Sequence, residues 1–329
     1  KCRPQDVHEE VLRRLREMGL LRIFLGIESG SAEGLDSIGR RQTVEDEHRA
    51  LQICEDLGIS TQYTMIIFHP EATPRTMLAD LAFVRDHAAH PLSFCRAEIY
   101  AGTPLEKRMI DAGRARGSYL AREYAYADPA TACAWEVAKD VLRERCWSRT
   151  NLQGQVIQLD HLMAVFGHFY DGRDVDARVR EFHEVELAVN LDTVGLFEEL
   201  IELCAEIPDA RSAELARRVA ILRENERTSR DPLQQRVCDL RDELKGTTRA
   251  MVGLTAPATP AAPPRVPVRP AHAAAVMLAI GLLGCGGDGR EDGGVIEAPP
   301  PPMDSGFDGA FVDDGGVVEA PPPPMDSGS

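Results

Sequence analysis

The sequence predicts an α/β fold built on parallel strands over its first 110 residues. The segment 20–27 is a nearly continuous apolar run, which is the pattern of a strand covered on both faces, and 59–68 and 92–100 are the next two strand candidates. Segments with helical spacing of apolar residues alternate with them: 6–18, 43–57 and 73–84. This alternating order implies parallel strands joined by right-handed crossovers. Three such units are too few to close a barrel alone, and they match the second half of one.

The helix starts carry capping signals. Thr43 is an N-cap residue followed three positions later by Asp46, which is a variant of the capping box. Thr73 stands before Pro74, and proline is favoured at the first position of a helix. After the third strand, a Gly-Thr-Pro turn leads into a short helix over 105–112. These signals support the boundaries that the apolar runs predict.

The rest of the chain predicts helices and then a tail. Five segments have helical periodicity: 135–145, 156–170, 175–189, 194–205 and 212–224. Fourteen of the 22 prolines lie beyond Thr248, and a segment at 292–306 recurs at 314–328 with one Ile-to-Val change. Such a tail has too little apolar content to fold. We therefore expect a first domain over 1–130, a helical extension over 131–247 and a disordered Pro- and Gly-rich tail over 248–329.

Charge and hydropathy exclude some classes of protein. A net charge of −16 argues against a nucleic-acid binder, which needs a basic face to neutralise phosphates. The apolar run at 273–283 is too short to span a bilayer, so no transmembrane helix is expected. The chain shows no N-terminal signal peptide. A cytoplasmic protein is the resulting expectation.

The cysteines and histidines do not form a recognisable metal motif. No two of the eight cysteines are separated by two or three residues, so a local zinc or iron–sulfur motif is absent from the sequence. We expect these cysteines to be reduced and buried. His161 and His168 share one helical face and His183 follows, but a metal site would need a further ligand placed by the fold. Surface or capped histidines are the favoured interpretation, and no metal site is predicted.

The clearest chemical signal follows the first strand. Residues 26–31 (GIESGS) lie at the carboxyl end of a buried strand, which is the edge where active sites form in parallel α/β folds. Gly26 and Gly30 would let a ligand approach the backbone closely. Glu28 can accept hydrogen bonds from ribose hydroxyls or an amine, and the two serines can contact a carboxylate. A solvated loop of ordinary turn residues is the alternative.

These residues carry a family resemblance. Residues 20–59 closely resemble the fourth strand, loop and helix of radical S-adenosylmethionine (SAM) enzymes, especially those that often carry an N-terminal cobalamin-binding domain. The family pattern of Gly-x-Glu-Ser-Gly-Ser, then Leu, Ile-Gly-Arg and a capping Thr occurs here as 26–31, Leu35, 38–40 and Thr43. The segments 65–73 and 99–105 resemble the fifth and sixth strands with their loops. The resemblance covers about residues 1–130.

The resemblance implies the second half of a partial (β/α)6 barrel of the TIM type. In the family, a Cys-x3-Cys-x2-Cys loop holds a [4Fe-4S] cluster whose open iron binds S-adenosylmethionine. Reductive cleavage then yields a 5′-deoxyadenosyl radical that abstracts hydrogen from the substrate. That motif is absent here, and Cys2-Arg3 resembles the end of the third strand. The chain is therefore predicted to be a fragment whose partner is the missing N-terminal half of the enzyme.

Site residues follow from the same resemblance. The predicted S-adenosylmethionine contacts are Glu28, Ser29, Ser31, Gly26 and Gly30, with Arg3 at the mouth of the preceding strand as a further candidate. His69 and Tyr100 are predicted to face the substrate. Many relatives have Gly-x-Pro-(Gly)-Glu-Thr where Phe68 and His69 stand here, which leaves the role of His69 open. The cluster ligands are expected outside this chain.

Several alternatives stay open at this point. The chain could be a catalytically inactive relic or an interaction module, so its being an enzyme is undecided, as are the substrate and the use of cobalamin. Tyr119, Tyr124 and Tyr126 could line the substrate mouth, although core packing is favoured. Residues 282–285 (LLGC) resemble a bacterial lipobox, for which an in-frame fusion and a chance Ala/Leu-rich linker are rival explanations. The repeat could be a duplicated spacer, a surface linker or a modification target.

Overall fold

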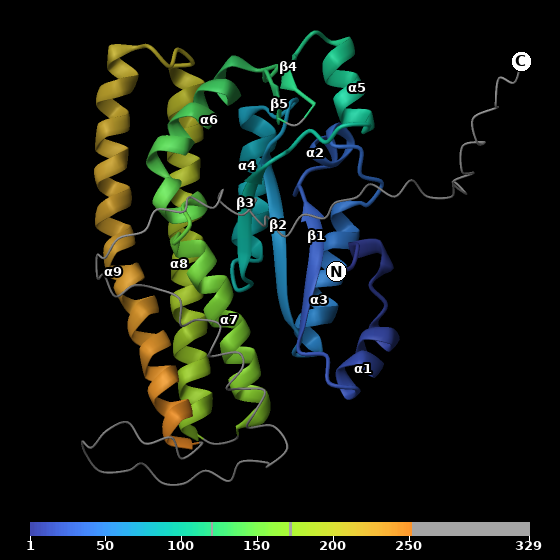
Figure 1. Ribbon diagram of the computed structural model, residues 1–329, viewed down its shortest axis with the longest axis vertical. Coiled ribbons are helices and arrows are strands. Elements are labelled where there is room, and N and C mark those ends of the chain that lie inside the picture. Colours follow the sequence, from blue (N-terminus) through green and yellow to red (C-terminus); the bar gives the residue numbers. More distant parts are fainter. Residues whose placement is uncertain (120, 171–172, 252–329) are drawn as a thin grey trace, which may run out of the picture. The chain divides into compact units, whose positions relative to one another are not determined.

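The computed structural model describes residues 1–119, 121–170 and 173–251 (Figure 1). These residues all fall within one unit of the chain, Lys1–Gly286. The expected tail lies outside the described residues from 252 onward, and so do Cys285 and both copies of the repeat. The lipobox-like segment and the alternatives for the repeat therefore stay predictions.

A parallel sheet forms the centre of the first 100 residues. It consists of β1 (Arg22–Glu28), β2 (Ser60–Phe68) and β3 (Leu92–Arg96), in the order β1-β2-β3 with both pairs parallel. Cys2 forms a parallel bridge with Leu25. Since the other edge of β1 pairs with β2, the bridge adds a fourth parallel neighbour in front of β1. The predicted mixed α/β fold with parallel strands is confirmed.

The third strand is shorter than the sequence predicts. It ends at Arg96, whereas the predicted strand continues to Tyr100. The amide of Ala97 still donates to the carbonyl of Phe68 at 2.7 Å. Because β2 ends at Phe68, the residues beyond Ala97 have no strand beside them to pair with. The sequence pattern alone does not predict that β3 ends at Arg96.

Helices alternate with the strands as predicted. Their bounds are α1 (Glu9–Glu17), α2 (Ala32–Ser37), α3 (Val44–Asp56), α4 (Pro74–Asp86) and α5 (Pro104–Asp111). Thr43 and Asp46 form the predicted capping box at α3. Thr73 caps α4, where Pro74 occupies the first helical position. A single turn of 3-10 helix, Pro4–Asp6, precedes α1, so the first helix begins later than the sequence predicts.

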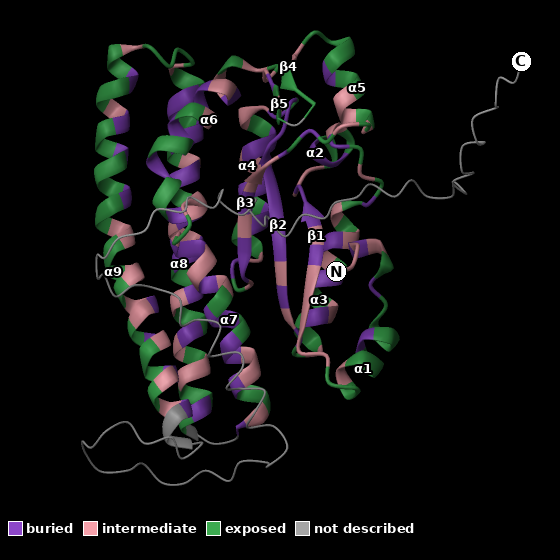
Figure 2. Ribbon diagram, viewed as in Figure 1, coloured by how far each residue is buried: buried purple, intermediate pink, exposed green. Residues whose placement is uncertain are grey.

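The two faces of the sheet differ. Tyr63 points to the face covered by α3 and α4, because its ring meets that of Phe83 edge-on at 6.4 Å. Side chains alternate along a strand, so Gln62 points to the opposite face. There Gln62 accepts a hydrogen bond from Arg22 at 3.1 Å. Half-buried polar side chains lie on this second face, and β1 and β3 show intermediate burial in Figure 2.

Long helices follow the sheet on the side of β3 (Figure 1). They are α6 (Pro129–Val141), α7 (Leu152–Phe169), α8 (Arg173–Glu206) and α9 (Ala213–Met251), with a π-helical turn at Arg143–Trp147. The sequence predicts two helices within α8, but no Gly or Pro separates them and the chain stays helical through Thr193. Likewise α9 continues far past residue 224 and into the segment expected as tail.

A hairpin that the sequence analysis did not predict follows α5. It consists of β4 (Ala115–Ser118) and β5 (Ala121–Tyr124), which are too short and polar to stand out as strands. Arg114 anchors the hairpin by donating to the carbonyls of Pro70 and Ala125. The hairpin therefore lies beside the loop that leaves the carboxyl end of β2.

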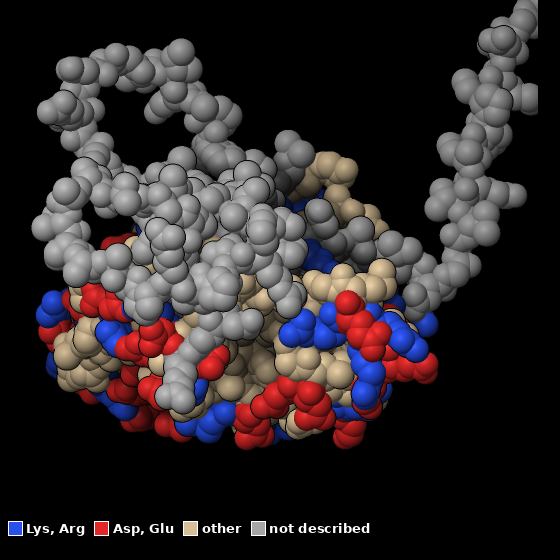
Figure 3. All heavy atoms as spheres, turned by 90° about the horizontal axis from the view of Figure 1, so that it is seen from below, with Lys and Arg blue, Asp and Glu red and all other residues tan. Residues whose placement is uncertain are grey.

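Packing and surface agree with an ordinary globular unit. One core cluster joins the sheet to α6 and α8, and within it the ring of Phe197 contacts the rings of Phe68 and Phe94. Acidic and basic side chains are interspersed on the face shown in Figure 3. Among the described residues, no helix is both long enough and apolar enough to span a membrane.

Candidate functional site

The carboxyl edge of the sheet brings together the ends of three strands. Glu28 ends β1, His69 follows β2 and Arg96 ends β3. Since all three strands run in one direction, these residues lie along one edge of the sheet. Tyr100 lies further on, in the loop between β3 and α5.

The backbone at Glu28 is strained. Its φ is +70°, and among the described residues it is the sole non-glycine with a positive φ. The amide of Ser29 donates to the carbonyl of Ile27 at 2.9 Å, so Glu28 occupies the centre of a γ-turn with positive φ. Such a conformation costs about 1–3 kcal/mol and persists only where the surroundings impose it. An outlier of this kind at the edge of a sheet points to function.

The Glu28 carboxylate is buried but incompletely paired. The residue is 2% exposed. Its Oε1 accepts a hydrogen bond from Arg40 at 2.5 Å, while Oε2 has no hydrogen-bond partner within the described part of the chain. Burial raises the pKa of Glu28, and the positive charges of Arg40 and Lys1 oppose that shift. A buried oxygen without a partner costs about 1–3 kcal/mol, so a ligand that donates a hydrogen bond there gains affinity.

The serines that follow have structural partners. Ser29 is fully buried and donates to Oδ1 of Asp80 at 2.6 Å, and the amide of Gly30 donates to the same oxygen at 2.8 Å. Ser31 is the N-cap of α2, where its Oγ accepts from the amide of Gly34 at 3.1 Å. Both hydroxyls thus hold the loop in place within this chain.

Steric contacts explain why positions 26 and 30 are glycines. A Cβ on Gly30 would lie 2.3 Å from the Cβ of Phe83, so this glycine permits close packing on α4. A Cβ on Gly26 would lie 3.1 Å from Oε1 of Glu28. Gly26 therefore leaves room for the carboxylate that follows it. We expected these glycines to let a ligand approach the backbone. At Gly30 the space is instead occupied by Phe83 of α4.

A second layer of buried polar groups lies behind the turn. The two hydrogens of the Gln42 Nε2 are shared among three acceptors, the carbonyls of Gly26 and Ile27 and Oε1 of Glu47, each 2.8 Å from the nitrogen. Burial raises the pKa of Glu47 to about 9 and that of Asp80 to about 7. Glu47 is therefore neutral at pH 7. Both acids are fully buried.

The sequence analysis missed Gln42, Glu47 and Asp80. A signal for Asp80 was present, because it lies on α4 between Met77 and Leu81 on the buried stripe, where an acid is out of place. Glu47 likewise lies one turn before Leu51 on the apolar face of α3. A polar residue on the apolar stripe of a helix indicates a buried polar network. The apolar stripe does not, however, predict which residues hydrogen-bond to Glu47 and Asp80.

His69 is buried with one nitrogen free of partners. It is 1% exposed, and its Nδ1 lies 2.9 Å from Oγ of Ser37. The Ser37 hydroxyl hydrogen is donated to the carbonyl of Gly34 at 2.7 Å, so Oγ must accept from Nδ1–H of His69. Nε2 then carries a lone pair, and it has no partner among the described residues. Burial, with a smaller effect of the Arg108 charge, lowers the pKa of His69 to about 4.

The remaining predicted site residues are less tightly arranged. Arg3 follows the Cys2 bridge and is half-buried beside the edge of β1. Tyr100 is 38% exposed, and its hydroxyl donates to Glu98 at 2.7 Å. It thus lies at the surface of the loop and not in the buried network around Glu28.

Two of the three clustered tyrosines pack at the end of β3. The guanidinium of Arg96 lies 4.0 Å from the ring centre of Tyr124, and its Nε donates to the hydroxyl of Tyr126 at 3.0 Å. Both tyrosines are largely buried, in agreement with the packing interpretation. Tyr119 is 72% exposed. These contacts tie the β5 end of the hairpin to the sheet edge.

No metal-binding group is found in the described residues. Residues 1–119, 121–170 and 173–251 contain no group of three His, Cys, Asp or Glu side chains that could hold a metal ion. His183 pairs with the buried Glu186 at 3.3 Å, a contact that raises the pKa of His183. His161 and His168 lie on α7 and do not join that pair in a metal site.

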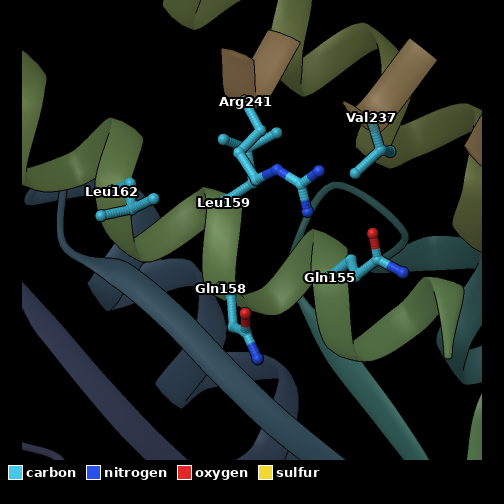
Figure 4. A pocket seen from close by; sticks show the side chains of 6 residues that line it. All are labelled: Gln155, Gln158, Leu159, Leu162, Val237 and Arg241. Atoms are coloured by element: carbon cyan, nitrogen blue, oxygen red, sulfur yellow. The ribbon is translucent and has the colours of Figure 1, made fainter. Parts of the chain in front are cut away.

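A small hollow lies between α7 and α9, away from the sheet edge (Figure 4). Its lining consists of Gln155, Gln158, Leu159, Leu162, Val237 and Arg241. Figure 4 shows the guanidinium of Arg241 reaching from α9 toward α7. The hollow has room for little more than a water molecule and no carboxylate or imidazole lines it. The carboxyl edge of the sheet is therefore the candidate site.

Comparison with known proteins gives a family match for the segment that contains the first two strand ends of this edge. Residues 2–84 match the family model described as the Radical SAM superfamily. The segment belongs to the radical SAM superfamily. It includes β1, β2 and most of α4, and therefore Glu28, His69 and Asp80.

Two individual proteins are similar to parts of this chain. The anaerobic magnesium-protoporphyrin IX monomethyl ester cyclase of Rubrivivax gelatinosus is 31% identical over 78 residues, which is 24% of this chain and 14% of the cyclase. A solved structure of the apo cobalamin-dependent S-adenosylmethionine radical enzyme OxsB aligns with a TM-score of 0.44 and 15% identity. That alignment covers 73% of this chain and 40% of OxsB. The chain thus spans only a minor part of either protein.

Proposed function

We propose that this chain supplies the second half of a radical SAM barrel, with strands four to six and the adjoining part of the S-adenosylmethionine site. Three features support the proposal: the match of residues 2–84, the parallel order β1-β2-β3, and the Cys2 bridge at the place of a preceding strand. In this proposal α6 to α9 form an extension that covers the β3 side. The 5′-deoxyadenosyl-radical chemistry belongs to the assembled enzyme, and the substrate is unassigned.

The observation that carries the proposal is the unpartnered carboxylate oxygen of Glu28. The carboxylate is buried at the strand end, its Oε1 pairs with Arg40, and its Oε2 has no partner among the residues that the structure describes, which fits a ligand with hydroxyl or amine donors. S-adenosylmethionine has both, in its ribose and its amino group. Burial raises the pKa of Glu28, and the Arg40 and Lys1 charges oppose that shift toward the ionised form, which is the stronger acceptor.

The other residues of the chain have supporting roles in this proposal. Ser29 and Ser31 hold the loop that presents Glu28, and Gly26 leaves room for its side chain. His69 offers the bare lone pair of Nε2 to a donor on a substrate or ligand. Tyr100 borders the same edge from the β3 loop, and Arg3 borders it from the Cys2 side.

The cluster and its ligands are assigned to the missing N-terminal half. When bound, the [4Fe-4S] cluster supplies the electron that cleaves S-adenosylmethionine. A cobalamin-binding domain ahead of that half is part of the same proposal, since the family resemblance is to enzymes that often carry one. The described residues of this chain bind, orient and shield the ligand.

Equilibrium binding of S-adenosylmethionine tests the proposal. The chain is joined to the upstream segment that carries the three-cysteine motif, the cluster is reconstituted, and affinity is measured for the parent and for Glu28→Ala. Loss of a charge-assisted hydrogen bond of about 1.5–3 kcal/mol weakens binding by roughly ten- to a hundredfold. The matched control is Glu33→Ala, which removes an exposed glutamate from α2.

The outcomes separate the proposal from its alternative. Weaker binding in Glu28→Ala with an intact cluster, and unchanged binding in Glu33→Ala, support it. Equal affinity of the parent and Glu28→Ala removes Glu28 from the site. If the joined protein with its cluster does not bind S-adenosylmethionine at all, the chain is a relic or an interaction module.

A further inference from the structure

We propose that Asp80 and Gln42 are positioning residues, which clamp the two flanks of the strained turn at Glu28 and so present its free oxygen to the ligand. The inference rests on the proposed role of Glu28 in binding S-adenosylmethionine. It assigns a role in that site to two side chains on other parts of the fold, neither of which touches the ligand.

The flank after Glu28 is held by α4. Oδ1 of Asp80 accepts from both the hydroxyl of Ser29 and the amide of Gly30, at 2.6 and 2.8 Å. Gly30 packs so closely on Phe83 that a side chain there would overlap it. Two hydrogen bonds and one close backbone contact thus fix the two residues that follow the turn to a single helix.

The flank before Glu28 is held by a side chain from the loop ahead of α3. Nε2 of Gln42 lies 2.8 Å from the carbonyls of both Gly26 and Ile27. The third contact of the same nitrogen, to Glu47 at 2.8 Å, anchors Gln42 on α3. Pairing with β2 is interrupted here, because the register passes from Leu25 directly to Glu28. Gln42 thus binds the two carbonyls at the point where the pairing of β1 with β2 shifts.

The clamp explains why the turn stays strained. A glutamate at φ +70° relaxes unless both neighbours are held, since the left-handed conformation is disfavoured for a residue with a Cβ. The residues on either side are each held by a buried side chain, which leaves Glu28 as the pivot. Relaxation of the turn would redirect Oε2 and disrupt the contact with Arg40.

The arrangement is costly for a purely structural loop. Glu28, Glu47 and Asp80 are all buried, and each has one carboxylate oxygen without a hydrogen-bond partner within the described residues. A glycine at position 28 would remove the backbone strain, and apolar residues in place of the buried acids would avoid their desolvation. A strained turn held by buried acids is the kind of feature that accompanies a ligand site.

Backbone NMR of the 329-residue chain tests the clamp without any ligand. Carbon shifts and the amide–α-proton coupling report whether residue 28 has a positive φ. We expect this signature in the parent, in Asp80→Asn, whose amide oxygen still accepts both hydrogen bonds, and in Asp86→Ala, an exposed control on α4. We expect its loss in Asp80→Ala. Retention of the positive φ in a folded Asp80→Ala protein overturns the clamp.

S-adenosylmethionine affinity in the cluster-containing protein tests whether the clamp serves the ligand. Asp80→Ala should weaken binding by the same factor as Glu28→Ala, about ten- to a hundredfold. The double variant should lose no more than either single variant, because Asp80 acts through Glu28. Asp80→Asn should restore most of the affinity. A merely structural Asp80 would instead give additive losses or none.

Failure of the clamp is distinguishable from failure of the proposed function. If Glu28→Ala binds as tightly as the parent, the proposed ligand role of Glu28 is wrong. If Glu28→Ala is weakened and Asp80→Ala is not, the positioning role is wrong and the ligand role stands. Should Asp80→Ala not fold, Ser29→Ala removes one of the two hydrogen bonds, and the same comparisons apply at smaller amplitude.

Discussion

Asp80 and Gly30 are 50 residues apart in the chain, and the carboxylate of one accepts the amide hydrogen of the other at 2.8 Å. This contact joins α4 to the loop after β1, across the intervening strand β2. It places a buried acid behind a strained turn at the edge of a parallel sheet. In the proposed site, the presentation of Glu28 therefore depends on a side chain outside the Gly-x-Glu-Ser-Gly-Ser motif.

The strain at Glu28 predicts an unusual order of stabilities. The free energy of unfolding of Glu28→Gly should exceed that of Glu28→Ala by about 1 kcal/mol, because glycine adopts a positive φ without steric cost. Both variants lose the carboxylate, so the pair isolates the backbone. Urea denaturation measures the difference. At Gln52, exposed in the middle of α3, the order should reverse, since alanine is the better helix former. Equal stability of the two Glu28 variants would mean that the turn is not strained.

Close packing at Gly30 predicts a steric effect. Gly30→Ala should destabilise the protein by about 1–3 kcal/mol, because the new methyl group overlaps Phe83 and the backbone carbonyl of Ala79. Thermal and chemical denaturation measure this. Gly195→Ala is the matched control, because its added Cβ meets no atom within 4 Å on helix α8. That control should be neutral or stabilising by about 0.5–1 kcal/mol. A neutral Gly30→Ala variant would show that α4 and the loop separate easily.

Glu47 predicts a loss of stability as the pH rises. Its pKa in the folded protein is raised from 4.5 to about 9, so the folded state binds the proton more tightly than the unfolded state. Its contribution is fully present below pH 4.5 and is lost as the pH rises toward 9.

The variant Glu47→Gln keeps an acceptor for Gln42 and cannot ionise. It should lose less stability than the parent between pH 5 and 9, with a difference on the order of a few kcal/mol at the upper end. Denaturation curves across that range measure the effect. Glu45→Gln, an exposed substitution on the same helix, should follow the parent. Parallel pH profiles for Glu47→Gln and the parent would contradict the raised pKa.

His69 is predicted to be a neutral imidazole with its proton on Nδ1. Since Ser37 accepts from that nitrogen and burial lowers the pKa to about 4, the ring should not titrate between pH 5 and 8. Nitrogen NMR of labelled histidine, with His69→Gln to assign the signal, distinguishes the two tautomers. A proton found on Nε2 would contradict the arrangement and would turn the unpartnered nitrogen into a donor.

The local signals of the sequence were sufficient for most elements around the sheet. The capping box at Thr43, the Thr73-Pro74 start and the buried strand patterns predicted α3, α4, β1 and β2 to within a few residues. Glu28 was a predicted site residue because it ends a buried strand. Each of these features depends on a few neighbouring residues, so residue spacing and local propensity predict it.

The tertiary structure decided what depends on distant partners. The hydrogen bonds of Ser29 and Gly30 to Asp80 and the end of β3 at Arg96 follow from contacts between segments far apart in the chain. The positive φ of Glu28 is the clearest case, because a residue with a Cβ disfavours this conformation and both of its neighbours are hydrogen-bonded to side chains from other segments. A local pattern predicts that Glu28 ends the strand. The direction of the Glu28 carboxylate depends on how α4 packs.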